Sequence, residues 1–315
     1  MLLPLCCFLA GLALPTLLPA LWARLRAPSS DADLYDAGAE ALLLNLDEPQ
    51  TRWFNMGSWD ASGQRSFAEA AAQLCRRVAQ AARLEPGQRV CEVGYGSGDS
   101  TLLLEREFSP STYLGLTSLA SQHATAVVRA DKAGLPSDRV RLKQGDAARD
   151  LDTEPAGSVD AVLAVDCAYH FNTRLSFLSS AARLLAPGGH LALTDLVLPS
   201  TPTSLLDRTL LHLLLLLAGV PRSNLVPLAT YRAELVAAGF DPSSVELTDI
   251  SDEVWPGFCA FVRTREERMG GGSQRGVLGT KWDGLRRYAS VVEWYAGVKS
   301  GNPKMRYYLV SARKA

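Results

Sequence analysis

Three glycines alternate with other residues directly after a short apolar run, at Gly94, Gly96 and Gly98. Glycine lets the backbone turn tightly and approach a ligand at the carboxyl end of a strand. The G-x-G-x-G spacing differs from the G-x-G-x-x-G of dinucleotide enzymes, and Glu92, two residues ahead, would repel a pyrophosphate. The pattern therefore predicts a loop for a cation-bearing ligand. The alternative is a tight strand–helix turn that binds nothing.

A second set of reactive side chains follows two later apolar runs. Asp166 and His170 come after residues 159–165, and Asp195 stands in the run 190–196. Because the carboxyl ends of neighbouring parallel strands line one crevice, His170 and Asp195 are expected to meet there. Histidine suits proton removal near neutrality, and a carboxylate can fix its tautomer. We predict His170 as a general base with Asp195 as its partner. The alternative is that His170 only bonds the following loop and Asp195 caps a strand.

S-adenosylmethionine carries the sulfonium and ammonium groups that the glycine loop suits. Residues 92–98 resemble motif I of the class I S-adenosylmethionine-dependent methyltransferases. Asp146 is similar to the family residue that binds the adenine amine, and Ala147 to the one whose backbone lies beside the ring. Residues 187–189, Pro-Gly-Gly, resemble the turn before the fifth strand, and residues 306–310 resemble the antiparallel seventh strand.

One departure from the common pattern is informative. The second strand ends in Thr117 and Ser118, where the family usually has an acidic residue for the ribose hydroxyls. Together with Gln122, this end resembles the G-x-T-x-x-x-x-Q variant of small-molecule and lipid methyltransferases, which include the cyclopropane-fatty-acid synthase, sterol and tocopherol types. Residues 55–59 resemble their N-x-G-x-W segment, which closes over the cofactor. The resemblance implies cofactor contacts from Tyr35, Trp59, Glu92, Gly94, Tyr95, Gly96, Gly98, Thr117, Ser118, Gln122, Asp146, Ala147 and Asp166.

The resemblance also bears on the proposed base. Residues 166–170 resemble the family's acidic-x-x-x-His element at the active-site mouth, with Asp166 where Glu is common. Sugar and antibiotic O-methyltransferases of similar sequence use a His/Asp arrangement, which implies these roles for His170 and Asp195. A sulfonium is already a good electrophile, so alignment and exclusion of water supply much of the effect and the base matters mainly for a hydroxyl acceptor. No metal is expected, and the cysteines lack metal-ligand spacing.

Short apolar runs alternate with helical segments between residues 67 and 196, which predicts βαβ units and a parallel sheet covered on both faces. The resemblance extends this to an α/β fold with a seven-stranded, Rossmann-like sheet, mostly parallel and with an antiparallel last strand. The predicted strands are residues 89–93, 112–116, 140–144, 159–165, 190–196, 245–250 and 305–311, and the predicted helices are residues 67–84, 100–108, 121–133, 176–185, 205–217, 231–238 and 282–298.

Residues 205–217, which follow the fifth strand, contain an intensely apolar stretch, residues 210–217. It is too short to span a bilayer. We predict an inserted lid helix within residues 199–230 that covers the acceptor pocket. An ordinary core helix and a patch that dips into a membrane are the alternatives. A run of three glycines predicts a flexible loop at about residues 265–280. A lid of this composition favours a lipophilic acceptor.

The first 23 residues are apolar or small, and the first charged side chain is Arg24. Roughly 20 apolar residues span a bilayer, so the tract predicts an N-terminal hydrophobic helix that anchors the protein. A cleaved signal peptide and a segment lying on the membrane surface are the alternatives. Residues 24–33 are then a linker and residues 34–315 the methyltransferase domain. The positive-inside tendency places that domain in the cytosol, as in a single-pass protein of the endoplasmic reticulum.

The composition narrows the functional classes. The 315 residues are 47% hydrophobic with a net charge of −1, which excludes a collagen-like, disulfide-scaffold or wholly disordered protein. The near-zero charge argues against a nucleic-acid partner, although residues 263–315 hold 12 Lys/Arg against 4 Asp/Glu. That basic region is expected either to touch anionic headgroups or to be a solvated face. We predict a membrane-associated methyltransferase of small, lipophilic acceptors. The alternatives are a soluble O-methyltransferase of secondary metabolism and an idle, membrane-bound binding protein.

Overall fold

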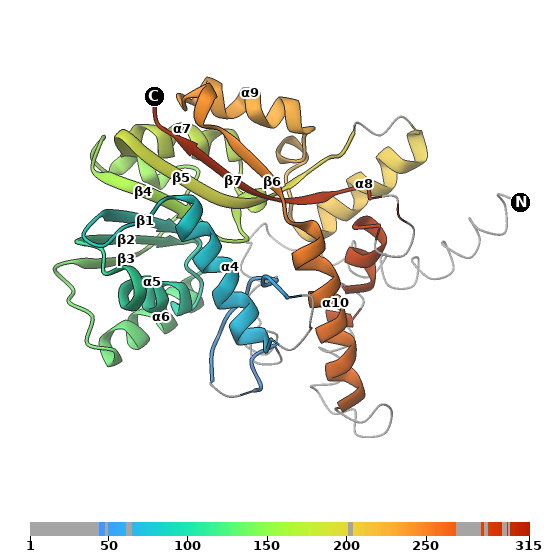
Figure 1. Ribbon diagram of the computed structural model, residues 1–315, viewed down its shortest axis with the longest axis horizontal. Helices are drawn as coiled ribbons and strands as arrows, with labels where there is room; N and C mark the ends of the chain where they lie inside the picture. Colours follow the sequence, from blue (N-terminus) through green and yellow to red (C-terminus); the bar gives the residue numbers. More distant parts are fainter. Residues whose placement is uncertain are drawn as a thin grey trace, which may run out of the picture.

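The computed structural model describes residues 44–47, 50–60, 65–200, 204–268, 285–286, 289–297, 301 and 303–315. One seven-stranded sheet runs through the molecule, with helices on both of its faces (Figure 1). The strands are β1 (Arg89–Val93), β2 (Thr112–Thr117), β3 (Val140–Gln144), β4 (Val159–Ala164), β5 (Leu185–Val197), β6 (Glu246–Asp249) and β7 (Arg306–Arg313). The helices are α4 (Phe67–Ala81), α5 (Asp99–Phe108), α6 (Ala120–Lys132), α7 (Arg174–Leu184), α8 (Leu205–Ala218), α9 (Leu228–Ala238) and α10 (Ser251–Arg268).

The strand order is β3-β2-β1-β4-β5-β7-β6. β1 pairs in parallel with both β2 and β4, whereas β7 runs antiparallel to β5 and β6. The predicted mixed sheet with an antiparallel last strand is therefore confirmed. The chain reverses its direction of winding between β1 and β4, and in open sheets of this kind ligands bind beyond the carboxyl ends of the strands at that point.

Alternating side chains divide the core into two hydrophobic clusters, one on each face of the sheet. On β4, Ala161 and Leu163 belong to the cluster under α4 and α10, while Val162 and Ala164 belong to the cluster under α7 and α9. This period of two is the expected behaviour of a strand that is covered on both faces. The sheet is thus held rigidly, and the loops at its carboxyl edge are positioned by it.

Helix α4 shows how local chemistry sets an element boundary. Ser66 caps the helix by accepting a hydrogen bond from the Glu69 amide at 3.3 Å, and the Glu69 carboxylate accepts one from the Ser66 amide at 2.8 Å. This reciprocal capping box satisfies two backbone donors that the first helical turn leaves open. The Ser66 amide and hydroxyl both donate to the Glu69 carboxylate, which lowers the pKa of Glu69.

Two predicted boundaries differ from the structure. Helix α10 continues to Arg268, so the first residues of the predicted flexible loop are helical, and its other residues, from 269 on, lie outside the described part. Residues 187–189 do not form a separate turn before the fifth strand. They lie inside β5, where the register against β4 shifts between Val159 and Ala161.

Helix α8 is not an ordinary core helix. Ser204 caps its start and Gly219, in the left-handed region at φ 65°, ends it. Leu215 is buried, whereas Leu205 is 79% and Leu216 is 44% exposed. A helix so apolar that still faces solvent on one side belongs at a binding surface more readily than in a core. The lid assignment for residues 199–230 stays a prediction.

The predicted membrane localisation is corrected. Among the helices of the described residues, none is both long and apolar enough to cross a membrane. The predicted anchor, residues 1–23, and the linker, residues 24–33, lie outside the described residues, so the structure gives the N-terminal hydrophobic helix no support.

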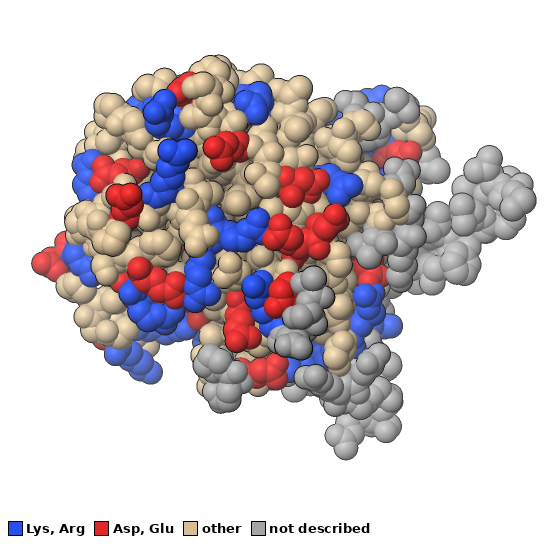
Figure 2. Space-filling model, viewed as in Figure 1, with Lys and Arg blue, Asp and Glu red and all other residues tan. Residues whose placement is uncertain are grey.

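Charges of both signs intermingle on the face of the molecule shown in Figure 2. Several cations of the basic C-terminal region are paired within the fold. Arg265 lies 2.7 Å from Asp47, and Lys304 lies 2.7 Å from Asp207. Further pairs of this region are Arg263–Glu293, Arg306–Asp249 and Arg313–Asp241. These cations have intramolecular partners, which favours the solvated face over a headgroup-binding one.

Candidate functional site

The glycine loop links β1 to α5 with its backbone in the left-handed region. Gly94, Gly96 and Gly98 have φ angles of 74°, 58° and 91°, which glycine adopts at little cost. A Cβ added to Gly94 would lie 2.5 Å from the Cys167 sulfur, and one added to Gly98 would lie 3.1 Å from the Ala126 Cβ. A Cβ on Gly96 would meet no atom within 4 Å. Packing therefore leaves no room for a side chain at Gly94 and little at Gly98, whereas Gly96 borders open space.

Glu92 is 1% exposed and lies on β1 beneath this loop. Its carboxylate accepts a hydrogen bond from the Tyr113 hydroxyl. Burial raises the pKa of Glu92 to about 7, although bonds from Ser100 and Tyr113 act in the opposite direction. A carboxyl group balanced between its two forms near neutrality can gain charge when a cation comes close.

An ion pair that the sequence reasoning missed braces the loop. Asp99, the first residue of α5, is buried and lies 2.5 Å from Arg129 on α6. The Arg129 guanidinium also donates to the Ser97 carbonyl at 2.8 Å, and the Arg52 amide donates to Asp99 at 3.1 Å. Asp99 thereby joins the glycine loop, α6 and the segment before α4. Sequence spacing gave no signal for it, because its partners lie 30 and 47 residues away.

Tyr95 fills the space beside the end of β2. Its hydroxyl lies 2.7 Å from the His123 Nδ1 and donates to the Lys143 carbonyl at 3.2 Å. A Cβ on Gly115 would lie 2.7 Å from the Tyr95 ring, so the glycine of the G-x-T pattern is needed for this ring. Tyr95 is buried, and burial raises its pKa. Its place fits a residue that shapes the ligand site.

The residues predicted to bind ribose and adenine lie at the carboxyl ends of β2 and β3. The Thr117 hydroxyl donates to the Gln122 side chain at 3.2 Å, so these two predicted residues are brought together. Ser118 follows directly, and its carbonyl accepts from Gln144 at 3.4 Å. Asp146 accepts from the Ala148 amide at 2.8 Å and keeps a partly exposed carboxylate.

The neighbouring Ala147 is buried within the hydrophobic cluster of the α7 face. Tyr35, in contrast, lies outside the described residues.

The N-x-G-x-W segment has a structural explanation for each of its three named residues. Asn55 accepts a hydrogen bond from the Gly57 amide at 2.9 Å. Gly57 has φ 76°, and a Cβ there would lie 2.8 Å from the Ala70 Cβ. The Trp59 indole packs against α10, because a Cβ on Gly257 would lie 2.2 Å from its ring. Trp59 thus faces a helix of the protein, and its predicted cofactor contact stays a prediction.

Asp166 joins this segment to the sheet. It has φ 57°, unusual for a residue with a side chain, and its amide donates to the Thr194 hydroxyl at 2.8 Å. Its carboxylate accepts from the Met56 amide and the Tyr169 hydroxyl, each at 2.8 Å, and from the Tyr307 hydroxyl at 2.5 Å. Loss of water around it raises the pKa of Asp166. Backbone strain of this kind concentrates at functional sites.

His170 ends a short 3₁₀ helix, Ala168–His170, that begins four residues after the last residue of β4. Its Nδ1 lies 3.2 Å from the Gly219 carbonyl oxygen at the end of α8, and its ring lies 4.4 Å from that of Tyr169, measured between centroids. The predicted base therefore lies between the carboxyl edge of the sheet and the predicted lid.

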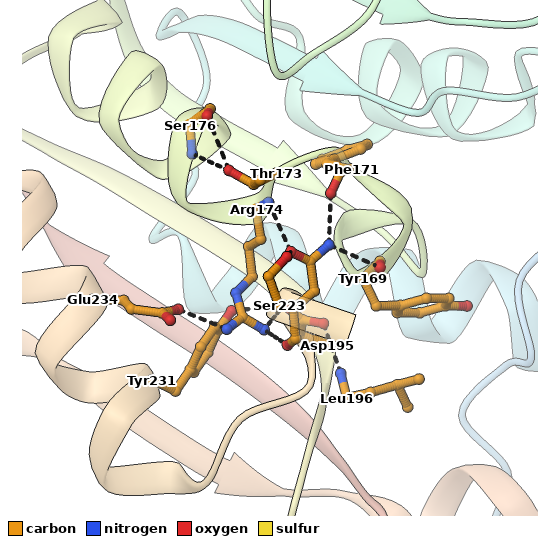
Figure 3. Close-up of polar contacts among 11 residues, drawn as sticks. Tyr169, Phe171, Thr173, Arg174, Ser176, Asp195, Leu196, Ser223, Tyr231 and Glu234 are labelled. Carbon is orange, nitrogen blue, oxygen red and sulfur yellow. Dashed lines mark hydrogen bonds and ion pairs between the residues drawn. The ribbon is translucent and has the colours of Figure 1, made fainter. Parts of the chain in front are cut away.

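Asp195 is not brought to His170 by any contact among the described residues. It is fully buried and accepts hydrogen bonds from the Tyr231 hydroxyl at 2.9 Å and from the Leu196 amide at 2.7 Å. The buried guanidinium of Arg174 lies 3.3 Å away (Figure 3). Burial raises the pKa of Asp195, and the Arg174 charge opposes that change. The carboxylate that was expected to pair with His170 thus pairs with Arg174 instead.

A cofactor with cationic groups fits these residues. The open space at Gly96, the buried Glu92 beneath the loop and the polar ends of β2 and β3 all lie at the carboxyl edge of β1 to β3. Among the described residues, no three His, Cys, Asp or Glu side chains are arranged to hold a metal ion.

Comparison with known proteins decides the family. A family model described as a methyltransferase domain matches residues 66–245, more than half of the chain. The chain belongs to the class I S-adenosylmethionine-dependent methyltransferases. Its cofactor is S-adenosylmethionine, as predicted.

Two relatives of this methyltransferase match most of its length. Erythromycin 3''-O-methyltransferase of Saccharopolyspora erythraea is 28% identical over 303 residues, which cover 93% of this chain and 92% of that protein. The 27-O-demethylrifamycin SV methyltransferase of Amycolatopsis mediterranei is 30% identical over 240 residues, 75% of this chain and 83% of that protein. The solved structure of the [4+2]-cyclase SpnF shares the fold, with a TM-score of 0.67 at 24% identity over 91% of this chain and 98% of that one.

Proposed function

We propose that this methyltransferase transfers a methyl group to a hydroxyl group of a small, lipophilic natural product. The contact between Gly94 and Cys167 carries the proposal. Because the two residues touch, the glycine loop lies against the segment that ends three residues later at His170. A cofactor on the loop and a base at His170 then share one edge of the sheet.

The residues divide into a cofactor side and an acceptor side. The backbone of the glycine loop, Glu92 and Asp146 would hold S-adenosylmethionine, which supplies an electrophilic methyl group when bound. His170 would take the proton of the acceptor hydroxyl. Helix α8, which exposes Leu205 and Leu216 and is followed by the glycine that contacts that histidine, would cover an apolar acceptor and keep water out.

The relatives support a hydroxyl acceptor. By their names, they methylate erythromycin and 27-O-demethylrifamycin SV. O-methylation of a secondary metabolite, the alternative to a membrane-associated enzyme, agrees better with these relatives. The lipophilic character of the acceptor rests on α8 alone.

Substitution of the base tests the proposal. We expect His170→Ala to slow methyl transfer by roughly 10²–10⁴-fold, the usual contribution of a general base. Transfer would be measured with radiolabelled cofactor on a panel of lipophilic alcohols and phenols that includes 27-O-demethylrifamycin SV. Binding of S-adenosylhomocysteine, measured by calorimetry, should not change. His190→Ala is the matched control, because His190 lies on β5 toward the opposite edge of the sheet. Full turnover by His170→Ala would overturn the role of this base, and a folded sample that binds no cofactor would overturn the whole proposal.

A further inference from the structure

The segment that follows α8 contacts His170 at its ring. The Gly219 carbonyl oxygen lies 3.2 Å from Nδ1. A carbonyl oxygen can only accept a hydrogen bond, so Nδ1 must carry the hydrogen. In a neutral imidazole the other nitrogen, Nε2, is then the one able to accept a proton. The end of the predicted lid therefore selects the tautomer that a general base at Nε2 requires.

The same segment also holds the backbone on both sides of His170. Asn224 is 1% exposed, and its side-chain amide donates to the Tyr169 carbonyl at 3.0 Å and to the Phe171 carbonyl at 2.6 Å. Its side-chain oxygen accepts from the Arg174 amide at 3.0 Å. Because both amide hydrogens face carbonyl oxygens and the side-chain oxygen faces an amide, only one orientation of this side chain satisfies all three partner groups. Asn224 thus clamps the peptide groups that flank the base.

A buried cation anchors the clamp. The Arg174 guanidinium, 1% exposed, donates to the Asn224 carbonyl and stacks 4.0 Å from the centre of the Tyr231 ring. It also pairs with Asp195 at 3.3 Å and with Glu234 at 2.6 Å, as Figure 3 shows. Removal of one member of such a buried network leaves uncompensated charge, so these residues hold one another in place.

We infer that Asn224 and the Gly219 carbonyl are positioning groups that fix the backbone and the tautomer of His170, with Asp195 acting on that histidine through Arg174. The catalytic consequence rests on the proposed function, because it requires His170 to be the base. The hydrogen position on His170 does not depend on the proposed function. The inference assigns it in the protein with no acceptor substrate bound.

The tautomer is measured in the full chain labelled with ¹⁵N-histidine, with the His170 signals assigned from the His170→Ala spectrum. We expect His170, when neutral, to carry its hydrogen on Nδ1. Two variants then break the clamp. Asn224→Leu removes the donors without adding charge, and Asn224→Asp replaces them with a carboxylate oxygen. In both, we expect a mixture of tautomers and a fall in kcat of tenfold or more, with KM and the affinity for S-adenosylhomocysteine unchanged.

The control is Arg222→Ala, on the same short turn but with an exposed side chain, which should leave tautomer and kcat as in the wild type. A wild-type His170 that carries its hydrogen on Nε2 would overturn the inference even if both Asn224 variants fail to fold. So would variants that keep the wild-type spectrum and kcat. Turnover by His170→Ala, in contrast, would refute the base while the spectrum still reports on the clamp, so the two failures are distinguishable.

Discussion

Three acidic residues at the carboxyl edge of the sheet have different electrostatic surroundings. Asp195 is paired with a buried guanidinium, and Asp166 accepts hydrogen bonds from two tyrosine hydroxyls and one amide. Glu92 has no cationic partner among its described hydrogen bonds, and burial brings its pKa to about 7. Of the three, Glu92 is therefore the one whose charge a bound cation would most readily change.

The affinity for S-adenosylmethionine should rise between pH 6 and pH 8. Glu92 is protonated below its pKa of about 7 and ionised above it, and the cofactor's cationic groups favour the carboxylate. If only the ionised form binds, the dissociation constant falls by up to about tenfold over this range. Calorimetry at a series of pH values measures this dissociation constant. We expect Glu92→Gln to bind more weakly at pH 8 and with a flat pH dependence. The same steep dependence in Glu92→Gln would contradict the assignment.

The stability of the folded protein without cofactor has the opposite pH dependence to cofactor affinity. The unfolded chain ionises Glu92 near 4.5, whereas the folded chain retains the proton to about 7. The free energy of unfolding without cofactor therefore decreases as the pH rises through this window, by about 3 kcal/mol at most from this residue. Urea unfolding of the parent and of Glu92→Gln at pH 5 and pH 7.5 would measure this decrease in the free energy of unfolding. Equal pH dependence in both proteins would assign the effect to other groups.

At the residue scale, the sequence predicted those functional groups that belong to a recognisable local pattern. The glycines and Glu92 lie within seven residues, and the histidine follows shortly after a strand. Arg174 and Asn224 were missed because the groups they contact belong to residues 21 to 60 positions away. The pairing of His170 with Asp195 was inferred from neighbouring strand ends and from the resemblance, neither of which reveals that the buried Arg174 pairs with that carboxylate.

At the scale of elements, alternation of apolar runs predicted the order of strands and helices from β1 to α9. Helix α10 was missed, because Pro256 and Gly257 indicate a turn and yet lie inside it. Tertiary packing overrides their poor helix propensity. Trp59 lies against Gly257, and its ring is 5.6 Å from that of Phe261, one turn further along. The segment before α4 and helix α10 are therefore one packing unit.

The close approach of Trp59 predicts a reversed effect of a common stabilising substitution. Gly→Ala inside a helix usually stabilises a protein by about 0.5–1 kcal/mol. Gly257→Ala should instead destabilise by about 1–3 kcal/mol, because its Cβ would lie 2.2 Å from the Trp59 ring. Urea unfolding would give the free energies. Trp59→Ala in the same protein should remove the penalty, and Ala260→Gly, at an exposed site of α10, should show the ordinary helix effect. A Gly257→Ala protein more stable than its parent would refute the packing.

For the whole molecule, ligand binding and stability are coupled through the glycine loop. The sheet is covered by hydrophobic clusters on both faces, and a Cβ at Gly96 would meet no atom within 4 Å. A ligand that binds only the folded protein at 100 times its dissociation constant adds about 2.7 kcal/mol to the free energy of unfolding. S-adenosylhomocysteine should do so here, as measured by urea unfolding with and without the ligand.

Substitutions at two glycines distinguish the effect of ligand binding on stability from the effect of backbone strain. Gly96 and Gly87 have φ angles of 58° and 82°, and a Cβ at either would meet no atom within 4 Å. Gly96→Ala and Gly87→Ala should each destabilise the free protein by about 1–2 kcal/mol, the usual range for a side chain in the left-handed region. Only Gly96→Ala should also lose most of the stabilisation by S-adenosylhomocysteine, because its methyl group enters the space assigned to the cofactor. Equal stabilisation of both variants by the ligand would place the cofactor elsewhere. Loss of stabilisation in both would show that strain, rather than occupancy of that space, controls binding.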